Sequence, residues 1–513
     1  MAPSTSTAEQ PSVVEHFSIE GLYGYRSIGL DSKYAATVLI AGNGSGKTTL
    51  LGALDAFIRG QFSRLSTLQF ERINCKLRGV EEALTVTRND IDQISQIPVE
   101  SELWQAAKAF ELEPLTLVEF LENDFQNSDP SEFYEHHIFQ QILAKTGFST
   151  PNARSRCEKL AALLGGRNSN VDHIKKILAQ VLTDIEVVYL PTYRRIELSL
   201  PESGDVRRGR RRQSIQAKLG IPRRGLYAGD IQFGLADISE RLATLNQQML
   251  YQSNQGYEEI SANILNDLIN GSYERGNPSP EERPTKEALK LFFSRILEGG
   301  DAPYRYGPHR LGYLQIPDVE RIYAEENISV ESRKLLTYFL GKLNSVLQKT
   351  KDVEGVVEEF IRHCNQYLSG GDGSASLEQH ALESGQSLDD KKLTFNRRNL
   401  KVSVSSAVTG KKIPLDALSS GEKQMISLLA RLYLYPPKRK LLLIDEPELS
   451  LSIEWQRKIL SDVVNAPLCA QVIAITHSPF VFDNELEPFA TSVTLRIDRD
   501  PTRASISDGE VET

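Results

Sequence analysis

The sequence contains few cysteines, and no two of them lie close together. Cys75, Cys157, Cys364 and Cys469 are widely spaced in the 513 residues, and no CxxC pair occurs. Zinc sites and disulfide frameworks need cysteines at characteristic spacings, so this pattern argues against both. It fits a protein of the reducing cytoplasm.

The sequence also lacks long apolar runs, a signal peptide and an excess of positive charge. No stretch approaches the roughly 18–20 apolar residues of a membrane-spanning helix. The polar start "MAPSTSTAEQPS" predicts a disordered tail over residues 1–12 and, with no signal peptide, a cytoplasmic protein. The formal net charge is −9, so contact with nucleic acid would need a local basic patch.

Internal repeats and sustained heptads are missing as well, so long coiled-coil arms are not expected. The apolar pattern instead predicts an α/β fold in which a large, mainly helical insertion separates N- and C-terminal lobes. The predicted segments are a tail (1–12), an N-terminal lobe (13–95), a helical insert (96–185), a strand and Arg-rich segment (186–235), a second helical insert (236–368), a loop (369–391) and a C-terminal lobe (392–513). The last lobe should open with a hairpin that turns near Thr409–Gly410.

A glycine-rich turn follows an early strand in "VLIAGNGSGKTTLLGALDAF". It has the pattern of a phosphate-binding P-loop, with Ala41 in place of the first glycine, and a helix from Thr48 follows. Gly44 and Gly46 allow backbone N–H groups to point at a phosphate. Lys47 is expected to contact the β- and γ-phosphates, and the Thr48 hydroxyl to bind Mg²⁺. The predicted nucleotide-binding residues are Asn43, Gly44, Ser45, Gly46, Lys47, Thr48 and Thr49.

Two later apolar strands end in residues that could act on a triphosphate. "LLLIDEPE" ends in Asp445 and Glu446, and "QVIAITHSP" carries His477 just beyond its end. Parallel strands of α/β proteins direct their carboxyl ends toward the ligand crevice. Asp445 fits a Mg²⁺ ligand, and Glu446 fits the general base that polarises water. His477 would hydrogen-bond the γ-phosphate and the attacking water, although a lone histidine or acid pair can also be merely solvated.

A second helix N-terminus carries serines and a glycine in "LSSGEKQMISLLARLY". A serine N-cap explains one of these serines by itself. The same arrangement is also a second phosphate site, which makes sense if it serves a nucleotide on another subunit. The residues predicted to bind that nucleotide are Ser419, Ser420, Gly421 and Glu422.

In this order, the P-loop, LSSGE, DEPE strand and histidine resemble the ABC-type ATPases. The resemblance implies an ABC-type P-loop ATPase head that uses ATP and Mg²⁺. It also implies that two heads pair head-to-tail, each LSSGE signature capping the ATP on the other's P-loop. Hydrolysis is then expected only in this dimer. The segment "ELSLS" at Glu448 would lie at the interface between the two heads.

Further details resemble the PtuA ATPases of Septu anti-phage systems, including retron-linked ones: "YLPTYRRIE", "IDEPELSLSIEWQ" and "THSPFVFDNELEPFA". This implies an ATPase that senses infection and controls a separate nuclease, the HNH-type PtuB. The related AriA ATPases of PARIS, which hold a Toprim-type effector, have similar motifs. A RecF/SMC-like repair ATPase acting directly on DNA, or a nucleotide-bound scaffold with little turnover, remains open.

Four further features have competing interpretations. The Q-loop, which would contribute to the Mg²⁺ site, is either the Tyr193-Arg194-Arg195 stretch or Gln232. Tyr25-Arg26 could line the adenine or phosphate side of the nucleotide. An arginine cluster could grip DNA or RNA phosphates, or form a solvated loop. The cluster consists of Arg207, Arg208, Arg210, Arg211, Arg212, Arg223 and Arg224.

Overall fold

The computed structural model divides the chain into two compact units, Met1–Phe233 with Pro436–Thr513 and Gly234–Tyr435. The structure describes residues 7–42, 44–125, 136–191, 235–271, 283–298, 318–323, 329–368, 391–398, 401–435 and 438–497. The boundary between the units falls inside the predicted lobe 392–513. The LSSGE turn therefore belongs to the second unit, and the P-loop and DEPE strand to the first.

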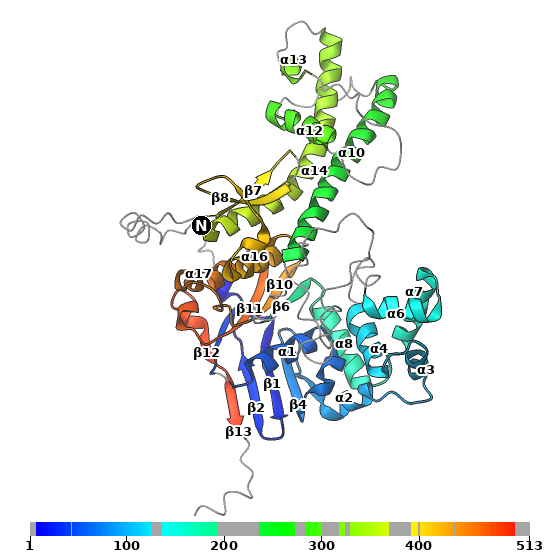
Figure 1. Ribbon diagram of the computed structural model, residues 1–513, viewed down its shortest axis with the longest axis vertical. Helices are drawn as coiled ribbons and strands as arrows, with labels where there is room; N and C mark the ends of the chain where they lie inside the picture. The colour runs from blue at the N-terminus through cyan, green and yellow to red at the C-terminus, as the bar shows by residue number, and fades with distance from the viewer. Residues whose placement is uncertain are drawn as a thin grey trace, which may run out of the picture. The chain divides into compact units, whose positions relative to one another are not determined.

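A parallel sheet forms the centre of the first unit (Figure 1). Its strands, in spatial order, are β12 (Ala490–Ser492), β3 (Ala36–Ile40), β11 (Cys469–Thr476), β10 (Arg439–Asp445) and β6 (Ile185–Leu190). All neighbouring pairs are parallel, and β11 is buried along its whole length. Such strands are rich in apolar residues because both faces of the sheet are covered. Segments from opposite ends of the chain thus share one sheet, and their carboxyl ends meet at one edge.

An antiparallel sheet forms a second layer. Its strands, in spatial order, are β13 (Thr494–Ile497), β2 (Arg26–Asp31), β1 (Val14–Leu22), β4 (Arg72–Leu77) and β5 (Leu84–Thr87). Helix α1 (Lys47–Ile58) follows the P-loop, close to the predicted start at Thr48. One apolar cluster joins the two sheets through α1, with Phe17 of β1, Phe57 of α1 and Leu441 of β10 among its members. Burial of these side chains fixes the helix that begins at Lys47.

The rest of the first unit, which includes the segment 96–185 interpreted above as a helical insert, is mainly helical. Its helices are α2 (Arg88–Ser95), α3 (Glu102–Ala109), α4 (Pro114–Glu119), a π-helical turn (Phe120–Phe125), α6 (His137–Thr146), α7 (Thr150–Ala162), α8 (Ser169–Val181) and α17 (Ile453–Val464). Short 3-10 turns cover Thr7–Glu9, Phe62–Thr67, Pro479–Val481 and Glu487–Phe489. Helices α3 to α7 pack around their own apolar cluster, which includes Phe110 and Phe139, whereas α8 packs on the cluster that contains α1.

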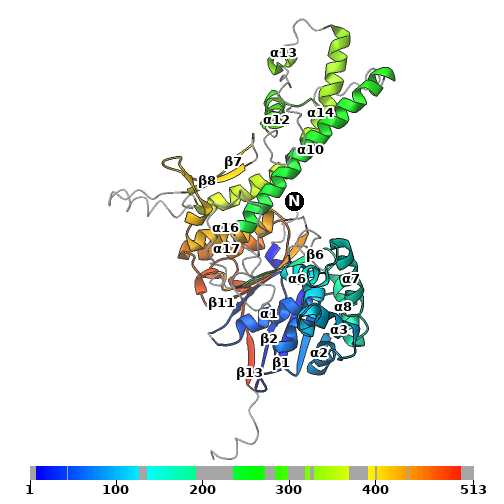
Figure 2. The ribbon, with the colours of Figure 1, turned by 45° about the vertical axis from the view of Figure 1, so that its right-hand side comes forward.

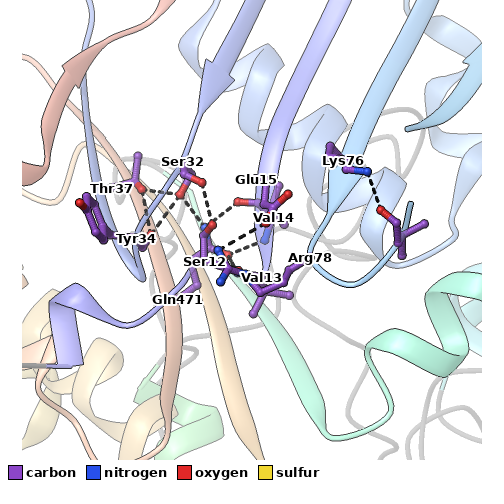
Figure 3. A network of polar contacts seen from close by, with 11 residues as sticks. Ser12, Val13, Val14, Glu15, Ser32, Tyr34, Thr37, Lys76, Arg78 and Gln471 are labelled. Carbon is purple, nitrogen blue, oxygen red and sulfur yellow. Dashed lines mark hydrogen bonds and ion pairs between the residues drawn. The ribbon is translucent and has the colours of Figure 1, made fainter. Parts of the chain in front are cut away.

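Part of the predicted disordered tail is ordered. The Ser12 hydroxyl donates to the Ser32 carbonyl at 2.7 Å, and Pro11 forms a β-bridge with Tyr34. Gln471 of β11, which is fully buried, accepts from the N–H groups of Val13 and Val14 at 2.8 Å each (Figure 3). These contacts explain why residues 7–12 are fixed although their sequence is polar.

Replacing Gln471 with methionine is expected to lower the free energy of unfolding by roughly 2–4 kcal/mol, because two buried N–H groups lose their acceptor. The Gln471 amide also donates to the Val14 carbonyl at 3.0 Å and to the Ser32 hydroxyl at 2.8 Å, and methionine retains only its volume. Urea unfolding measures the effect, with the exposed Gln105 changed to methionine as the control. Equal stability of the two variants would show that this amide is not a structural link.

The second unit contains two long helices, α10 (Leu235–Ile269) and α14 (Val330–Leu368). The Tyr338 hydroxyl donates to Asp267 Oδ2 at 2.9 Å, and a Cβ at Gly256 would lie 2.6 Å from Val346. The helices therefore run antiparallel and in close contact, side by side in both views (Figures 1 and 2). The sequence pattern, which predicted no long coiled-coil arms, did not reveal this helix pair. Helices α12 (Lys286–Glu298) and α13 (Val319–Tyr323) pack against α14.

A small sheet and one further helix complete the second unit. Strands β7 (Lys391–Asn396), β8 (Lys401–Ser406) and β9 (Lys412–Ile413) are antiparallel, and α16 spans Ser420–Tyr433. The turn between β8 and β9 contains Gly410 at φ 67°, as the hairpin prediction required. None of the described helices is both long and apolar enough to cross a bilayer. The predicted α/β P-loop fold, with a large, mainly helical insertion between its terminal segments, is confirmed.

Candidate nucleotide site

The P-loop connects β3 to α1 at the carboxyl edge of the parallel sheet. Gly44 and Gly46 have φ values of 79° and 92°, a left-handed conformation that strongly favours glycine. A Cβ at Gly46 would also approach Ile28 Cδ1 to 3.3 Å. Lys47, Thr48 and Thr49 form the first turn of α1, so free N–H groups and the positive end of the helix dipole lie at this loop.

Lys47 pairs with the general-base candidate. Its Nζ lies 3.0 Å from Glu446 Oε1, and its side chain is only 7% exposed. A buried ammonium group needs an anionic partner, because its desolvation is otherwise uncompensated. The structure therefore brings together two residues 399 positions apart that the sequence assigned to one site.

Thr48 and Asp445 supply two adjacent oxygens. The Thr48 hydroxyl donates to Asp445 Oδ2 at 2.7 Å, and Asp445 is buried. Mg²⁺ favours oxygen ligands and usually takes only one or two protein carboxylates, with phosphate and water completing its shell. No group of three or more His, Cys, Asp or Glu that could hold a metal occurs in the described part of the chain. A hydroxyl beside one carboxylate thus fits Mg²⁺ held jointly with a phosphate.

Glu446 has an unusual backbone conformation. Its φ is 53°, which is uncommon for a residue with a Cβ and costs on the order of 1–3 kcal/mol. Its N–H donates to the Ile475 carbonyl of β11 at 2.9 Å, which holds the strained turn in place. The carboxylate then reaches Lys47 and lies 3.6 Å from His477 Nδ1.

His477 is held mainly by Glu448, for which the sequence predicted no role at the nucleotide site. Its Nδ1 lies 2.9 Å from Glu448 Oε1, and its backbone N–H donates to the same oxygen at 3.0 Å. Glu448 is the second glutamate of the DEPE motif and is 5% exposed. A third acid beside Asp445 and Glu446 was the only signal in the sequence that could have identified it.

Arg26 lies against the P-loop. Its Nη1 donates to the Gly44 carbonyl at 3.2 Å, and its guanidinium lies 5.4 Å from the ring centroids of both Tyr23 and Tyr25. These two tyrosines are exposed. The structure thus places Tyr25 and Arg26 beside the phosphate loop, together with Tyr23, which the sequence analysis did not name.

The LSSGE turn forms the N-terminus of α16 in the second unit. The exposed Ser419 is the N-cap: its hydroxyl accepts from the Glu422 N–H at 3.3 Å, and its N–H donates to Glu422 Oε2 at 2.6 Å. Lys391 pairs with both Glu422 carboxylate oxygens at 3.0 and 2.8 Å. Ser420 is half-buried and Gly421 buried. Within this chain, Ser419 therefore acts as the N-cap of α16, as the capping interpretation predicted.

Several predicted site residues lie outside the described residues: Asn43, Tyr193, Arg194, Arg195, Gln232 and the arginine cluster from Arg207 to Arg224. The alternatives for the Q-loop and for nucleic-acid contact therefore remain predictions.

Two buried groups of the first unit, Asp55 and Cys469, have shifted pKa values. Burial by itself raises the pKa of Asp55 in α1, but the positive charges of Arg59 and Arg64 outweigh it and lower the pKa overall. Arg64 Nη1 lies 2.7 Å from Asp55 Oδ2, which ties α1 to the following turn. Burial raises the pKa of Cys469, at the start of β11, to about 12. A thiol with this pKa is protonated at neutral pH and does not act as a nucleophile.

Comparisons with known proteins agree with a nucleotide-binding site in general terms. Residues 335–483 match the family described as "AAA domain, putative AbiEii toxin, Type IV TA system". This range contains the LSSGE turn, Asp445, Glu446 and His477. The match supports an ATP-binding ATPase. No curated protein matches the chain.

One similar solved structure is the Smc head domain with an extended coiled coil from Pyrococcus furiosus, bound to the C-terminal domain of ScpA. It is 12% identical in sequence, and the match covers 94% of this chain and 96% of that one, with a TM-score of 0.34.

Proposed function

We propose that this protein is an ABC-type ATPase that binds Mg²⁺–ATP at its P-loop and hydrolyses it. The convergence of five side chains from three neighbouring strand ends carries the proposal. Lys47 and Thr48 follow β3, Asp445 and Glu446 lie at the end of β10, and His477 follows β11. In the hydrolytic reaction, Lys47 binds phosphate oxygens, Glu446 accepts a proton from water at Oε1, and His477 hydrogen-bonds that water.

The Lys47–Glu446 pair links binding to catalysis. While Glu446 Oε1 accepts from Lys47 Nζ at 3.0 Å, this oxygen is less available as a base. A triphosphate offers Lys47 a more highly charged partner and so frees Glu446 for the water. Thr48 and Asp445 would hold Mg²⁺, which when bound neutralises charge on the phosphates. Glu446 therefore becomes available as a base when the nucleotide binds.

The completed site is proposed to need a second copy of the chain. Exposure of Ser419 at the start of α16 and the ABC-like order of motifs support a head-to-tail pair. In that pair the N-terminus of α16 faces the nucleotide on the partner's P-loop, where free N–H groups favour an anion. Homo-oligomers built from such pairs are the expected assembly.

The biological role we propose is control of a separate nuclease in anti-phage defence, as in PtuA-type Septu systems with an HNH-type partner. The resemblance of "IDEPELSLSIEWQ" and "THSPFVFDNELEPFA" to those ATPases supports this role. The matched family, whose description names a toxin of a toxin–antitoxin system, also supports a role of this class.

Co-purification tests this role. The native complex would be isolated with wild type, Lys47→Ala and Glu446→Gln, and bound chains would be identified by mass spectrometry. We expect a nuclease chain whose recovery depends on the nucleotide state. Recovery of no protein partner, together with tight ATP-dependent DNA binding by the purified protein alone, would instead favour a RecF/SMC-like repair ATPase.

A further inference from the structure

We propose that Glu448 is a positioning residue that fixes the ring of His477 and places its neutral-state proton on Nδ1. One oxygen, Oε1, lies 2.9 Å from the ring nitrogen Nδ1 and accepts from the backbone N–H at 3.0 Å. These two contacts set both the position and the rotation of the imidazole. The inference deepens the proposed function, because it states which ring nitrogen of His477 is available to the reacting groups.

The surroundings of Nδ1 specify its protonation. The two carboxylate oxygens closest to it belong to Glu448 at 2.9 Å and Glu446 at 3.6 Å. Ionised carboxylates have no proton to offer Nδ1, so their negative charge at these distances favours the ring form that carries a proton on Nδ1. In the neutral ring this leaves Nε2 with a lone pair, because only one of the two ring nitrogens then carries a proton. Nε2 can then accept a hydrogen bond from the attacking water.

Other contacts hold the backbone next to His477. Ser478 Oγ donates to Gln456 Oε1 at 2.8 Å, and Gln456 Nε2 donates to the Leu451 carbonyl at 2.9 Å. The Ser478 N–H also donates to Thr476 Oγ1 at 3.0 Å. The loop is therefore anchored on both sides of the histidine without Glu448. Removing the Glu448 charge should therefore alter the orientation and protonation of the His477 ring more than it alters the fold of the loop.

A purely structural role would not require a carboxylate here. Oε2 of Glu448 is buried and has no hydrogen-bond partner in the described part of the chain. Burying a charged group with an unused oxygen is costly for stability. Glutamine could still accept from the His477 N–H, but it carries no charge to favour the Nδ1 proton. A carboxylate at position 448 is thus explained by its effect on the His477 ring, as in other sites where a carboxylate orients a histidine.

Nitrogen-15 NMR of histidine-labelled protein tests the inference without nucleotide, so it does not depend on ATPase activity. At a pH where His477 is neutral, the wild type and Glu446→Gln should show the Nδ1–H form. Glu448→Gln should show a mixture with the Nε2–H form. The signal is assigned by its loss in His477→Gln. Glu487→Gln removes the charge of an exposed glutamate and should leave the spectrum unchanged.

Kinetics provide the second readout. Glu448→Gln is expected to lower kcat about 10- to 100-fold, as for other residues that orient a site's ligands or bases, with KM for ATP little changed. An Nε2–H form in the wild type would overturn the proposal, even if Glu448→Gln did not fold. A wild-type spectrum in Glu448→Gln would overturn it as well. Absence of ATPase activity in the wild type would instead contradict the proposed function and leave the spectral result standing.

Discussion

Replacing Lys47 with alanine is expected to weaken ATP binding roughly 10- to 100-fold, since a charge-assisted hydrogen bond contributes about 1.5–3 kcal/mol. Turnover should fall further, by about 10³-fold, because the lysine also neutralises charge that develops during phosphoryl transfer. Titration with a fluorescent ATP analogue measures binding, and phosphate release measures turnover.

The alanine variant also leaves Glu446 without the cation that lies 3.0 Å away, so stability must be measured in parallel. The double variant Lys47→Ala, Glu446→Gln removes both partners and should recover stability but not binding. Lys33→Ala removes an exposed lysine of the same unit and should bind ATP normally. Wild-type ATP affinity in Lys47→Ala would contradict the assignment of the P-loop.

Changing Glu446 to glutamine is expected to lower the hydrolysis rate about 10²–10⁴-fold while ATP binding is retained. Glutamine keeps the length of the side chain but cannot accept the proton of the attacking water. Because the variant binds without hydrolysing, it should accumulate as an ATP-dependent dimer. Single-turnover assays measure the chemical step, and light scattering measures the mass.

The control is Glu454→Gln, which changes an exposed glutamate in the first turn of α17 (Ile453–Val464). It should hydrolyse ATP like the wild type. Should Glu446→Gln retain wild-type turnover, Glu446 would not be the base. Should the wild type itself show almost no turnover, a nucleotide-bound scaffold would be the better description.

The parts of the site that local sequence encodes could be predicted. Gly44 and Gly46 occupy left-handed positions that favour glycine, and apolar runs identified β3, β10 and β11. Since parallel strands end at the same edge of a sheet, the meeting of Lys47 with Glu446 follows from the sequence once the fold class is known. The hairpin turn at Gly410 could be predicted for the same reason, because the residues of the turn itself determine it.

Contacts that depend on strand register could not be predicted. Asp445 is paired with Ile475 across β10 and β11, and this register places Glu448 beside His477 just beyond the strand ends. Gln471 bonds Val14 across 457 positions, so nothing in the local sequence marks it. In such cases the neighbouring strand, and not the residue's own segment, decides the partner.

The α10–α14 pair was missed for another reason. Apolar residues of α14, such as Leu340 and Leu343, share a cluster with Phe292 of α12 and Val319 of α13. One helix therefore packs against several neighbours, and its apolar positions do not follow a single heptad seam. A search for sustained heptads does not detect such a pair.

Mixing two inactive variants tests whether each ATPase site is built from two copies of the chain. Lys47→Ala damages the P-loop, and Ser419→Arg blocks the exposed start of α16. Each alone should hydrolyse almost no ATP. Their equimolar mixture should recover about one quarter of wild-type turnover, because random pairing gives mixed dimers with one intact composite site. Turnover by the mixture no higher than that of the separate variants, or full activity of Ser419→Arg alone, would contradict a site shared between two copies.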